Sequence, residues 1–269
     1  MREISGRRVL ITGGAGGLGH AMARRFAAEG AELVLTDVVK ATLDDMVADF
    51  VRRGVACRGY VVDVTDPAAI ARLREQLHAE AGPVHVLVNN AGIVHGGPFL
   101  EVPVEKHLRT YRVNVEGVVA MTHAFLPDLV AADEGHLVNV ASASGFVGLP
   151  FGSTYASSKW AVIGLAESLR LELKKLGHGH VRCVVGGEGI PQRERSPGEF
   201  LVVVALDAEV EQPVEARGGA LDIKLLLADE PTQSAEHFRV QKEGGVDLIA
   251  HYPAGQIGGR LPQDQLQRA

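Results

Sequence analysis

Tyr155 and Lys159 stand near the start of a helical pattern that runs over residues 152–175. A spacing of i and i+4 places the phenol and the ammonium on the same face of a helix. A lysine cation beside a phenol favours the phenolate and lowers the tyrosine pKa, which makes the tyrosine a candidate proton-transfer group near neutral pH. For this pair alone, a surface lysine beside a half-buried tyrosine is the commoner arrangement. The rest of the chain therefore has to decide between the two interpretations.

The composition is that of an ordinary globular protein. The 269 residues are 46% hydrophobic and 22% charged, which suits one large domain. The net charge of -6 gives no basic surface, so we expect no nucleic-acid partner. Cys57 and Cys183 lie far apart in apolar runs, which predicts buried thiols in a reducing compartment and no metal site. With neither a signal peptide nor a run of roughly 18 apolar residues, we expect a cytoplasmic protein without a membrane span.

Short apolar runs alternate with helical patterns over the first two thirds of the chain. The expected strands cover 8–14, 31–37, 55–66, 84–92, 135–145 and 180–185, and the expected helices cover 18–29, 43–53, 66–82, 104–114, 115–132 and 152–175. Strands this apolar are buried on both faces, as parallel strands covered by helices are. The pattern predicts an α/β fold: a doubly wound, Rossmann-like parallel sheet in a single domain of three layers. Ligands of such sheets bind at the carboxyl ends of the strands, where we searched for further candidate residues.

The first expected strand runs into the glycine-rich segment TGGAGGLG, residues 12–19. Gly13, Gly17 and Gly19 allow a tight turn and a close approach of the backbone to a pyrophosphate at the N-terminus of the next helix. The cluster has the context that a dinucleotide site needs, because it follows a strand and opens a helix. We therefore expect Gly13, Gly17, Leu18 and Gly19 to contact a dinucleotide cofactor.

The second expected strand ends in Asp37. A carboxylate at this point can accept hydrogen bonds from both ribose hydroxyls of an adenosine and would repel a 2′-phosphate, which favours NAD over NADP. Lys40 lies close in sequence and could partly neutralise such a phosphate. The alternative for Asp37 is a helix N-cap.

The next two strand ends carry further candidates for cofactor binding. Asp63 could accept a hydrogen bond from an adenine amino group while the backbone of Val64 reads the ring edge, and a simple turn aspartate is the alternative. The fourth strand ends in NNAG, where Asn89 can tie neighbouring strand ends. Ala91 and Gly92 then give a flat floor for a ribose.

Together and in this order, the motifs resemble the short-chain dehydrogenase/reductase family over about residues 5–185. The motifs are TGxxxGxG, a strand-terminal Asp, DV, NNAG, Asn114 in the following helix, Ser142 after the fifth strand, and the YxxxK of Tyr155 and Lys159. The resemblance implies an oxidoreductase that transfers a hydride between NAD(H) and a secondary alcohol or ketone. It also implies a homodimer or homotetramer.

The resemblance also implies a role for each residue of the catalytic set. Tyr155 would be the general acid/base, and Lys159 would hold the nicotinamide ribose and lower the tyrosine pKa. Ser142 would bind the substrate oxygen, with Ser144 as its rival. Asn114 would hold a water molecule that links Lys159 to solvent.

The segments expected over this site, 93–99 and 144–154, are apolar and contribute no cation. An uncharged, lipophilic alcohol or ketone therefore suits them better than an acid or a sugar phosphate, and the resemblance extends to members that act on steroids and retinoids. The alternative is an NAD(H)-binding sensor or scaffold without turnover. The complete set of serine, tyrosine and lysine argues against it, and the unusual C-terminal part argues mildly for it.

Residues 1–190 are expected to form the cofactor-binding and catalytic core, and the family pattern breaks beyond them. Glu188 and Gly189 stand where the family has a Pro-Gly pair. The run 214–230 could be a penultimate helix, and 238–245 could be the last strand and its turn. We expect the divergent residues 191–269 to pack on the same domain, and both divergence and a reading-frame shift could explain them.

Overall fold

The computed structural model describes residues 4–186, 235–242 and 246–253. The chain divides into two units, Met1–Leu206 and Asp207–Ala269. The first unit contains a six-stranded sheet and the second contains a two-stranded sheet.

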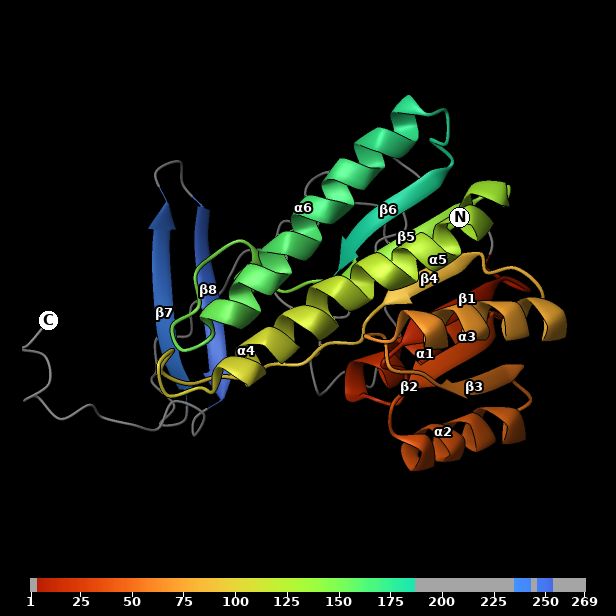
Figure 1. Ribbon diagram of the computed structural model, residues 1–269, viewed down its shortest axis with the longest axis horizontal. Coiled ribbons are helices and arrows are strands. Elements are labelled where there is room, and N and C mark those ends of the chain that lie inside the picture. The colour runs from red at the N-terminus through yellow and green to blue at the C-terminus, as the bar shows by residue number, and fades with distance from the viewer. Residues whose placement is uncertain (1–3, 187–234, 243–245, 254–269) are drawn as a thin grey trace, which may run out of the picture. The chain divides into compact units, whose positions relative to one another are not determined.

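The six-stranded sheet of the first unit is entirely parallel, with the strand order β3-β2-β1-β4-β5-β6 (Figure 1). Its strands are β1 (Arg8–Thr12), β2 (Glu32–Asp37), β3 (Cys57–Val61), β4 (Val86–Asn89), β5 (Gly135–Val140) and β6 (Val181–Gly186). The order reverses between β1 and β4, and this switch point is where ligands of doubly wound sheets bind. The predicted α/β fold is therefore confirmed.

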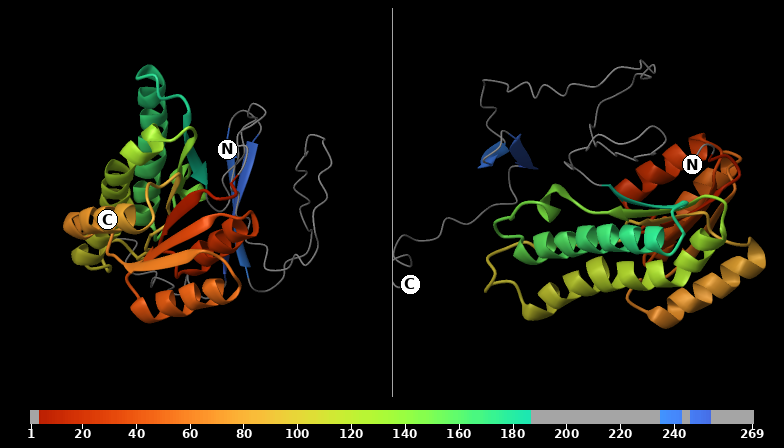
Figure 2. Two further views of the ribbon diagram at one scale, coloured as in Figure 1. Left: turned by 90° about the vertical axis from the view of Figure 1, so that its right-hand side faces the viewer. Right: turned by 90° about the horizontal axis from the view of Figure 1, so that it is seen from above.

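Helices lie on both faces of this sheet (Figure 2). They are α1 (Gly17–Ala28), α2 (Lys40–Arg52), α3 (Pro67–Glu80), α4 (Val104–Tyr111), the π-helix η1 (Arg112–Glu116), α5 (Gly117–Ala131), the 3₁₀-helix η2 (Ala143–Gly145) and α6 (Ser153–Lys175). Successive strand residues point to opposite faces. In β1, Val9 and Ile11 join a core cluster with residues of α1 and α2, whereas Leu10 joins a second cluster with residues of α3, α5 and α6. This packing on two faces explains why the strands are apolar throughout.

The sequence predicted two helices over 104–132, and the structure joins them through η1. A π-helix inserts an extra residue into the helical turn, and such insertions are frequent at functional sites. Asn114 lies in this segment and is buried. Asp66 is the N-cap of α3, because its carboxylate accepts hydrogen bonds from the first-turn backbone N–H groups of Ala68 and Ala69.

The two-stranded sheet of the second unit consists of β7 (Ala235–Lys242) and β8 (Val246–Pro253). The strand expected near 238–245 exists, but it pairs antiparallel with β8 and does not extend the parallel sheet. The pair Glu188–Gly189 and the run 214–230 lie outside the described residues, and the packing of 191–269 on the core stays a prediction. None of the helices in the described ranges is both long and apolar enough to cross a membrane.

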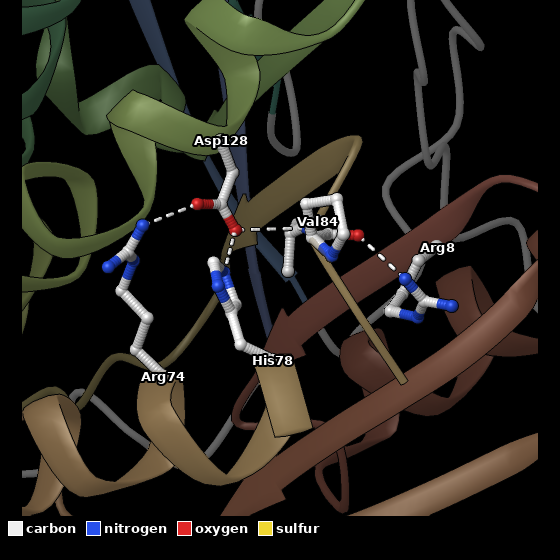
Figure 3. A network of polar contacts seen from close by, with 6 residues as sticks. Arg8, Arg74, His78, Val84 and Asp128 are labelled. Atoms are coloured by element: carbon white, nitrogen blue, oxygen red, sulfur yellow. Dashed lines mark hydrogen bonds and ion pairs between the residues drawn. The ribbon is translucent and has the colours of Figure 1, made fainter. Parts of the chain in front are cut away.

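Asp128 connects α5 to α3 and to the segment before β4 through a network around its buried carboxylate (Figure 3). Its side chain is 2% exposed and accepts hydrogen bonds from Arg74 Nη2 at 2.8 Å and His78 Nε2 at 2.7 Å. The backbone N–H of Val84 donates a third bond at 3.1 Å. Arg8 reaches the preceding carbonyl of Pro83 at 2.7 Å, which continues the connection to β1. The carboxylate therefore has partners on both oxygens, as a buried charge requires.

Replacing Asp128 by Asn is expected to lower the free energy of unfolding by about 2–4 kcal/mol, because the amide keeps only one acceptor oxygen and its NH2 group must face at least one of the three donors. Urea denaturation of the two proteins at pH 7 measures the difference. The matched control is Asp44→Asn, which removes an exposed i,i+4 partner of Lys40 and should change stability only slightly. Similar losses in the two variants would contradict a special contribution from the buried carboxylate.

Candidate active site

The glycine-rich turn between β1 and α1 is shaped by contacts that exclude side chains. A Cβ on Gly19 would lie 2.3 Å from the carbonyl oxygen of Gly13, so this close approach requires glycine. Gly13 has φ +62° and faces the backbone of Ala91. By contrast, a Cβ on Gly17 would meet nothing within 4 Å. The first turn of α1 is therefore open where a phosphate could approach, and no side chain caps this helix.

Thr12 and Asn90 join this turn to the end of β4. Asn90 Nδ2 donates to the carbonyl oxygens of Thr12 at 2.9 Å and Gly13 at 3.0 Å. The Thr12 hydroxyl oxygen accepts from the backbone N–H groups of Asn90 and Ala91, both at 3.0 Å. Neither Thr12 nor Asn90 was among the site residues predicted from the sequence. For Asn90 the sequence carried a signal, because it follows the last residue of a buried strand and is the first that can turn toward a neighbouring loop.

Asn89 lies in the interior of the protein. Its Nδ2 donates to Thr122 Oγ1 at 3.0 Å and to Asn139 Oδ1 at 2.9 Å, and the residue is 3% exposed. The predicted tie between strand ends is confirmed, since Asn139 stands opposite Asn89 in β5. A direct contact between Asn89 and a cofactor stays a prediction.

The Asp37 carboxylate lies beside the glycine-rich turn. Its Oδ2 accepts from the backbone N–H of Ala15 at 3.1 Å, and its Oδ1 accepts from that of Val39 at 3.1 Å. The N-cap of α2 is Val39, so Asp37 is not the N-cap of this helix and the alternative interpretation of Asp37 is wrong. Asp37 and the turn that would hold the pyrophosphate are thus brought together at the carboxyl ends of β1 and β2.

Asp63 and Val64 occupy the turn after β3. Asp63 Oδ1 accepts from the backbone N–H of Thr65 at 2.9 Å and from its hydroxyl at 2.7 Å, which gives this side chain a local turn role. Val64 is buried and packs against Gly117 at the start of α5. Their contacts with an adenine stay predictions.

Tyr155 and Lys159 share one face at the start of α6, as their spacing predicted. Lys159 Nζ lies 5.6 Å from the centroid of the Tyr155 ring. Lys159 is 5% exposed, and its ammonium donates to the carbonyl oxygen of Val140 at 2.8 Å. Burial lowers the pKa of Lys159 to about 8. The structure therefore holds a desolvated cation next to the phenol.

Asn114 meets this pair from the π-helix η1. Its Oδ1 accepts from the backbone N–H of Ile93 at 2.8 Å, and its Nδ2 donates to the carbonyl of the same residue at 2.9 Å. Nδ2 also donates to Ser158 Oγ at 3.0 Å, and Ser158 donates to the Tyr155 carbonyl at 2.7 Å. Ser158 therefore links Asn114 to the backbone of Tyr155, a role that was not predicted from the sequence.

Gly92 lies between Asn114 and Lys159. A Cβ at this position would lie 3.4 Å from Asn114 Oδ1 and 3.5 Å from Lys159 Nζ. The flat floor expected at Ala91 and Gly92 thus lies beside the lysine. The ribose contact itself stays a prediction.

Ser142 and Ser144 differ in their exposure. Ser142 is half-buried at the N-cap of η2, and its Oγ accepts from the backbone N–H of Ser144 at 3.2 Å. Ser144 is buried. The next residue, Gly145, packs so closely on Lys159 that a Cβ would lie 3.0 Å from the lysine carbonyl oxygen. Ser142 is therefore the more accessible hydroxyl of a segment that packs on the Tyr155 helix.

The assembled site offers the groups that a carbonyl–alcohol interconversion needs: a proton carrier beside a cation, a hydroxyl for the substrate oxygen, and a turn suited to a pyrophosphate. Within the described ranges, no cluster of three or more His, Cys, Asp or Glu residues could hold a metal ion.

The amino-acid sequence of this chain is similar to those of several known oxidoreductases. Human 17-beta-hydroxysteroid dehydrogenase 13 is 36% identical over 176 residues, which cover 65% of this chain and 59% of that protein. Mouse epidermal retinol dehydrogenase 2 is 39% identical over 173 residues, which cover 64% of this chain and 56% of that protein. The chain thus matches somewhat more than half the length of these relatives.

Solved structures share the fold. A short chain dehydrogenase/reductase from Burkholderia phymatum in complex with NAD aligns with a TM-score of 0.67 and 33% identity, over 70% of this chain and 67% of that one. A gluconate 5-dehydrogenase from Burkholderia cenocepacia in complex with NADP and tartrate aligns with a TM-score of 0.65 and 27% identity, over 69% of this chain and 72% of that one. Residues 7–188, which include the glycine-rich turn, Ser142, Tyr155 and Lys159, match the family described as short chain dehydrogenase. The chain belongs to this family of oxidoreductases.

Proposed function

We propose that the chain is an NAD-dependent dehydrogenase that transfers a hydride between NAD(H) and a lipophilic secondary alcohol or ketone. The observation that carries the proposal is the buried Lys159 ammonium 5.6 Å from the Tyr155 ring. Burying a cation costs free energy, and groups whose pKa is strongly shifted by burial concentrate at functional sites. Beside a phenol that must give up and recover its proton, the cation has a function, because it stabilises the phenolate.

In the proposed mechanism Tyr155 accepts the hydroxyl proton of the alcohol, or donates it to the ketone in the reverse direction. Ser142 Oγ donates a hydrogen bond to the substrate oxygen and stabilises the charge that develops there. Lys159 stabilises the phenolate electrostatically and would hold the nicotinamide ribose. Asn114 would hold a water molecule that passes the proton toward solvent. When bound, the nicotinamide supplies the hydride acceptor or donor.

The position of Asp37 supports NAD as the cofactor. Its carboxylate lies at the edge of the glycine-rich turn, where a negative charge would repel a 2′-phosphate. Lys40 is paired with Asp44 on the same helix at 2.5 Å, so its charge is already partly compensated. One structural relative binds NAD and another binds NADP, so the preference rests on this carboxylate.

Three phenylalanines support a lipophilic substrate. Phe146 and Phe151 lie between Ser142 and Tyr155, Phe99 follows β4, and all three rings are exposed in the structure. Two relatives are named for a hydroxysteroid and a retinol, which agrees with this chemistry. Assembly into a homodimer or homotetramer and a cytoplasmic location stay predictions from the sequence.

Replacing Tyr155 by Phe is expected to lower kcat about 10²–10⁴-fold, because the proton carrier is removed, while the Kd for NADH stays within about twofold. The test is NAD reduction at 340 nm with a panel of lipophilic secondary alcohols, and NADH binding is followed by energy transfer from Trp160. Wild-type turnover that survives the substitution would contradict the role of Tyr155. Tight NADH binding without turnover on any alcohol or ketone would favour a sensor or scaffold.

Replacing Asp37 by Asn is expected to weaken NADH binding about 10-fold and to narrow the gap between NADH and NADPH, because the amide removes the repulsion of a 2′-phosphate. Trp160, 53% exposed on α6, is the only tryptophan and reports the titration of both dinucleotides. Lys40→Met is the control, which should leave the preference for NADH unchanged. Equal affinity of the wild type for both dinucleotides would contradict the assignment.

Replacing Lys159 by Met is expected to raise the free energy of unfolding at pH 7 by about 1–3 kcal/mol while abolishing turnover, because the variant no longer buries an ammonium. The folded pKa of about 8 lies below the ordinary value of 10.5, so the cost of burial is full below pH 8. It is relieved between about pH 8 and 10.5, as the folded state loses its proton before the unfolded state does.

The stability gain of Lys159→Met should therefore shrink as the pH rises toward 10. Urea denaturation at pH 7, 8.5 and 10 measures it, with Lys174→Met at an exposed position of the same helix as the control. A gain that does not depend on pH would show that the burial of charge is not its cause.

A further inference from the structure

The loop of residues 93–103 connects β4 to α4 and is tied to the segment that leads into α6. The backbone N–H of Gly97 donates to the carbonyl of Phe151 at 2.7 Å. Phe151 immediately precedes Gly152, the N-cap of the helix that carries Tyr155. The loop therefore contacts the catalytic helix at its N-terminal end.

His107 makes a second tie between the same two segments. It lies on α4, which packs beside the start of α6 (Figure 1). Its Nδ1 lies 2.6 Å from Thr154 Oγ1, and its Nε2 lies 3.0 Å from the carbonyl oxygen of Phe99. Its ring also stacks on the Phe99 ring, with centroids 4.5 Å apart and planes inclined by 26°. One half-buried imidazole thus touches the loop with its ring face and Nε2, and touches α6 with Nδ1.

The partners fix the direction of these hydrogen bonds. A carbonyl oxygen can only accept, so His107 Nε2 carries the hydrogen that is donated to Phe99. In the neutral ring Nδ1 is then an acceptor, and the Thr154 hydroxyl donates to it. The chain of bonds runs from Thr154 through His107 to Phe99. Thr154 is 7% exposed and is the residue before Tyr155.

Phe151 gives an independent sign that this segment is held under constraint. Its φ is +59°, the left-handed region that phenylalanine rarely adopts, and it is the only described residue other than glycine with a positive φ. Such a conformation costs of order 1–3 kcal/mol and persists only where the surroundings enforce it. The bond from Gly97 and the bridge through His107 supply contacts on either side of Gly152 that can enforce it.

We propose that His107 is a positioning residue, which fixes the first turn of α6, and with it Tyr155, against the loop of residues 93–103. The proposal rests on the proposed role of Tyr155 in proton transfer. His107 does not touch the reacting atoms. It acts through Thr154 on one side and through Phe99 on the other, so the two arms of the bridge can be separated by mutation.

Three substitutions in the full chain separate these arms. His107→Phe keeps an aromatic ring that can stack on Phe99 but removes both hydrogen bonds. His107→Asn puts an amide near the position of Nδ1 and can keep the bond to Thr154. His107→Gln extends its amide to the position of Nε2 and can keep the bond to Phe99.

Hydrogen–deuterium exchange measured by mass spectrometry tests the bridge without requiring turnover. We expect His107→Phe to speed amide exchange in two peptides, one from 93–103 and one from 152–158, by about 10-fold. His107→Asn should speed exchange only in the first peptide, and His107→Gln only in the second. The matched control is Tyr111→Phe, which removes another α4–α6 hydrogen bond, from Tyr111 to Ser157 at 2.8 Å, and should leave exchange in 93–103 unchanged. Wild-type exchange in both peptides of His107→Phe would overturn the proposal.

Steady-state kinetics with a lipophilic secondary alcohol and NAD test the effect on Tyr155. We expect kcat to fall about 10-fold in His107→Phe, because small misplacements of a catalytic group are costly, with the Kd for NADH unchanged. His107→Asn, which can keep the bond to Thr154, should restore most of kcat, whereas His107→Gln should not. A kcat in His107→Phe equal to that of the wild type would overturn the positioning role. If the wild type itself turns over no substrate, the proposed function fails, and the exchange pattern still decides whether His107 bridges the loop and the helix.

Discussion

The ammonium group of Lys159 is buried, and the surrounding elements provide a hydrogen-bond acceptor and the space that it needs. The Val140 carbonyl at the end of β5 receives one of its hydrogens, while Gly92 leaves room that a side chain would fill. Asn114 lies beside the same glycine, because the π-helix η1 places its amide against the backbone of Ile93. The ends of β4 and β5 and the helices η1 and α6 therefore meet near one ammonium group.

The glycine-rich turn is built by a different kind of constraint. Gly13 and Gly19 approach each other so closely that no side chain fits, and Asn90 fastens the turn to β4 through two carbonyl oxygens. The shape of the turn is therefore fixed by contacts within the protein: the close approach of Gly13 and Gly19, and the hydrogen bonds from Asn90. Only Gly17 faces open space, which is the side from which a pyrophosphate could approach.

Near Tyr155, the structure retains features that cost stability. A desolvated lysine and a phenylalanine with a positive φ lie within a few residues of the phenol. Strain and buried charge of this kind concentrate at functional sites and depend on a rigid surrounding structure. Here the rigidity comes from the two apolar clusters on the faces of the sheet and from the fully partnered Asp128. The proposed bridge through His107 extends this rigidity to the first turn of α6.

The sequence by itself determined the parallel α/β fold and the pairing of Tyr155 with Lys159, because strand apolarity, helix caps and i,i+4 spacing are local properties. The motif order likewise identified the family. The tertiary structure alone decided that Asn90 holds the glycine-rich turn while Asn89 lies in the interior, because strand register fixes the face on which each side chain lies. It also decided that Ser158 and His107 link distant segments and that β7 pairs with β8. The contacts of Ser158 with Asn114 and of His107 with Thr154 join residues 44 and 47 positions apart, so local sequence patterns carry no record of them.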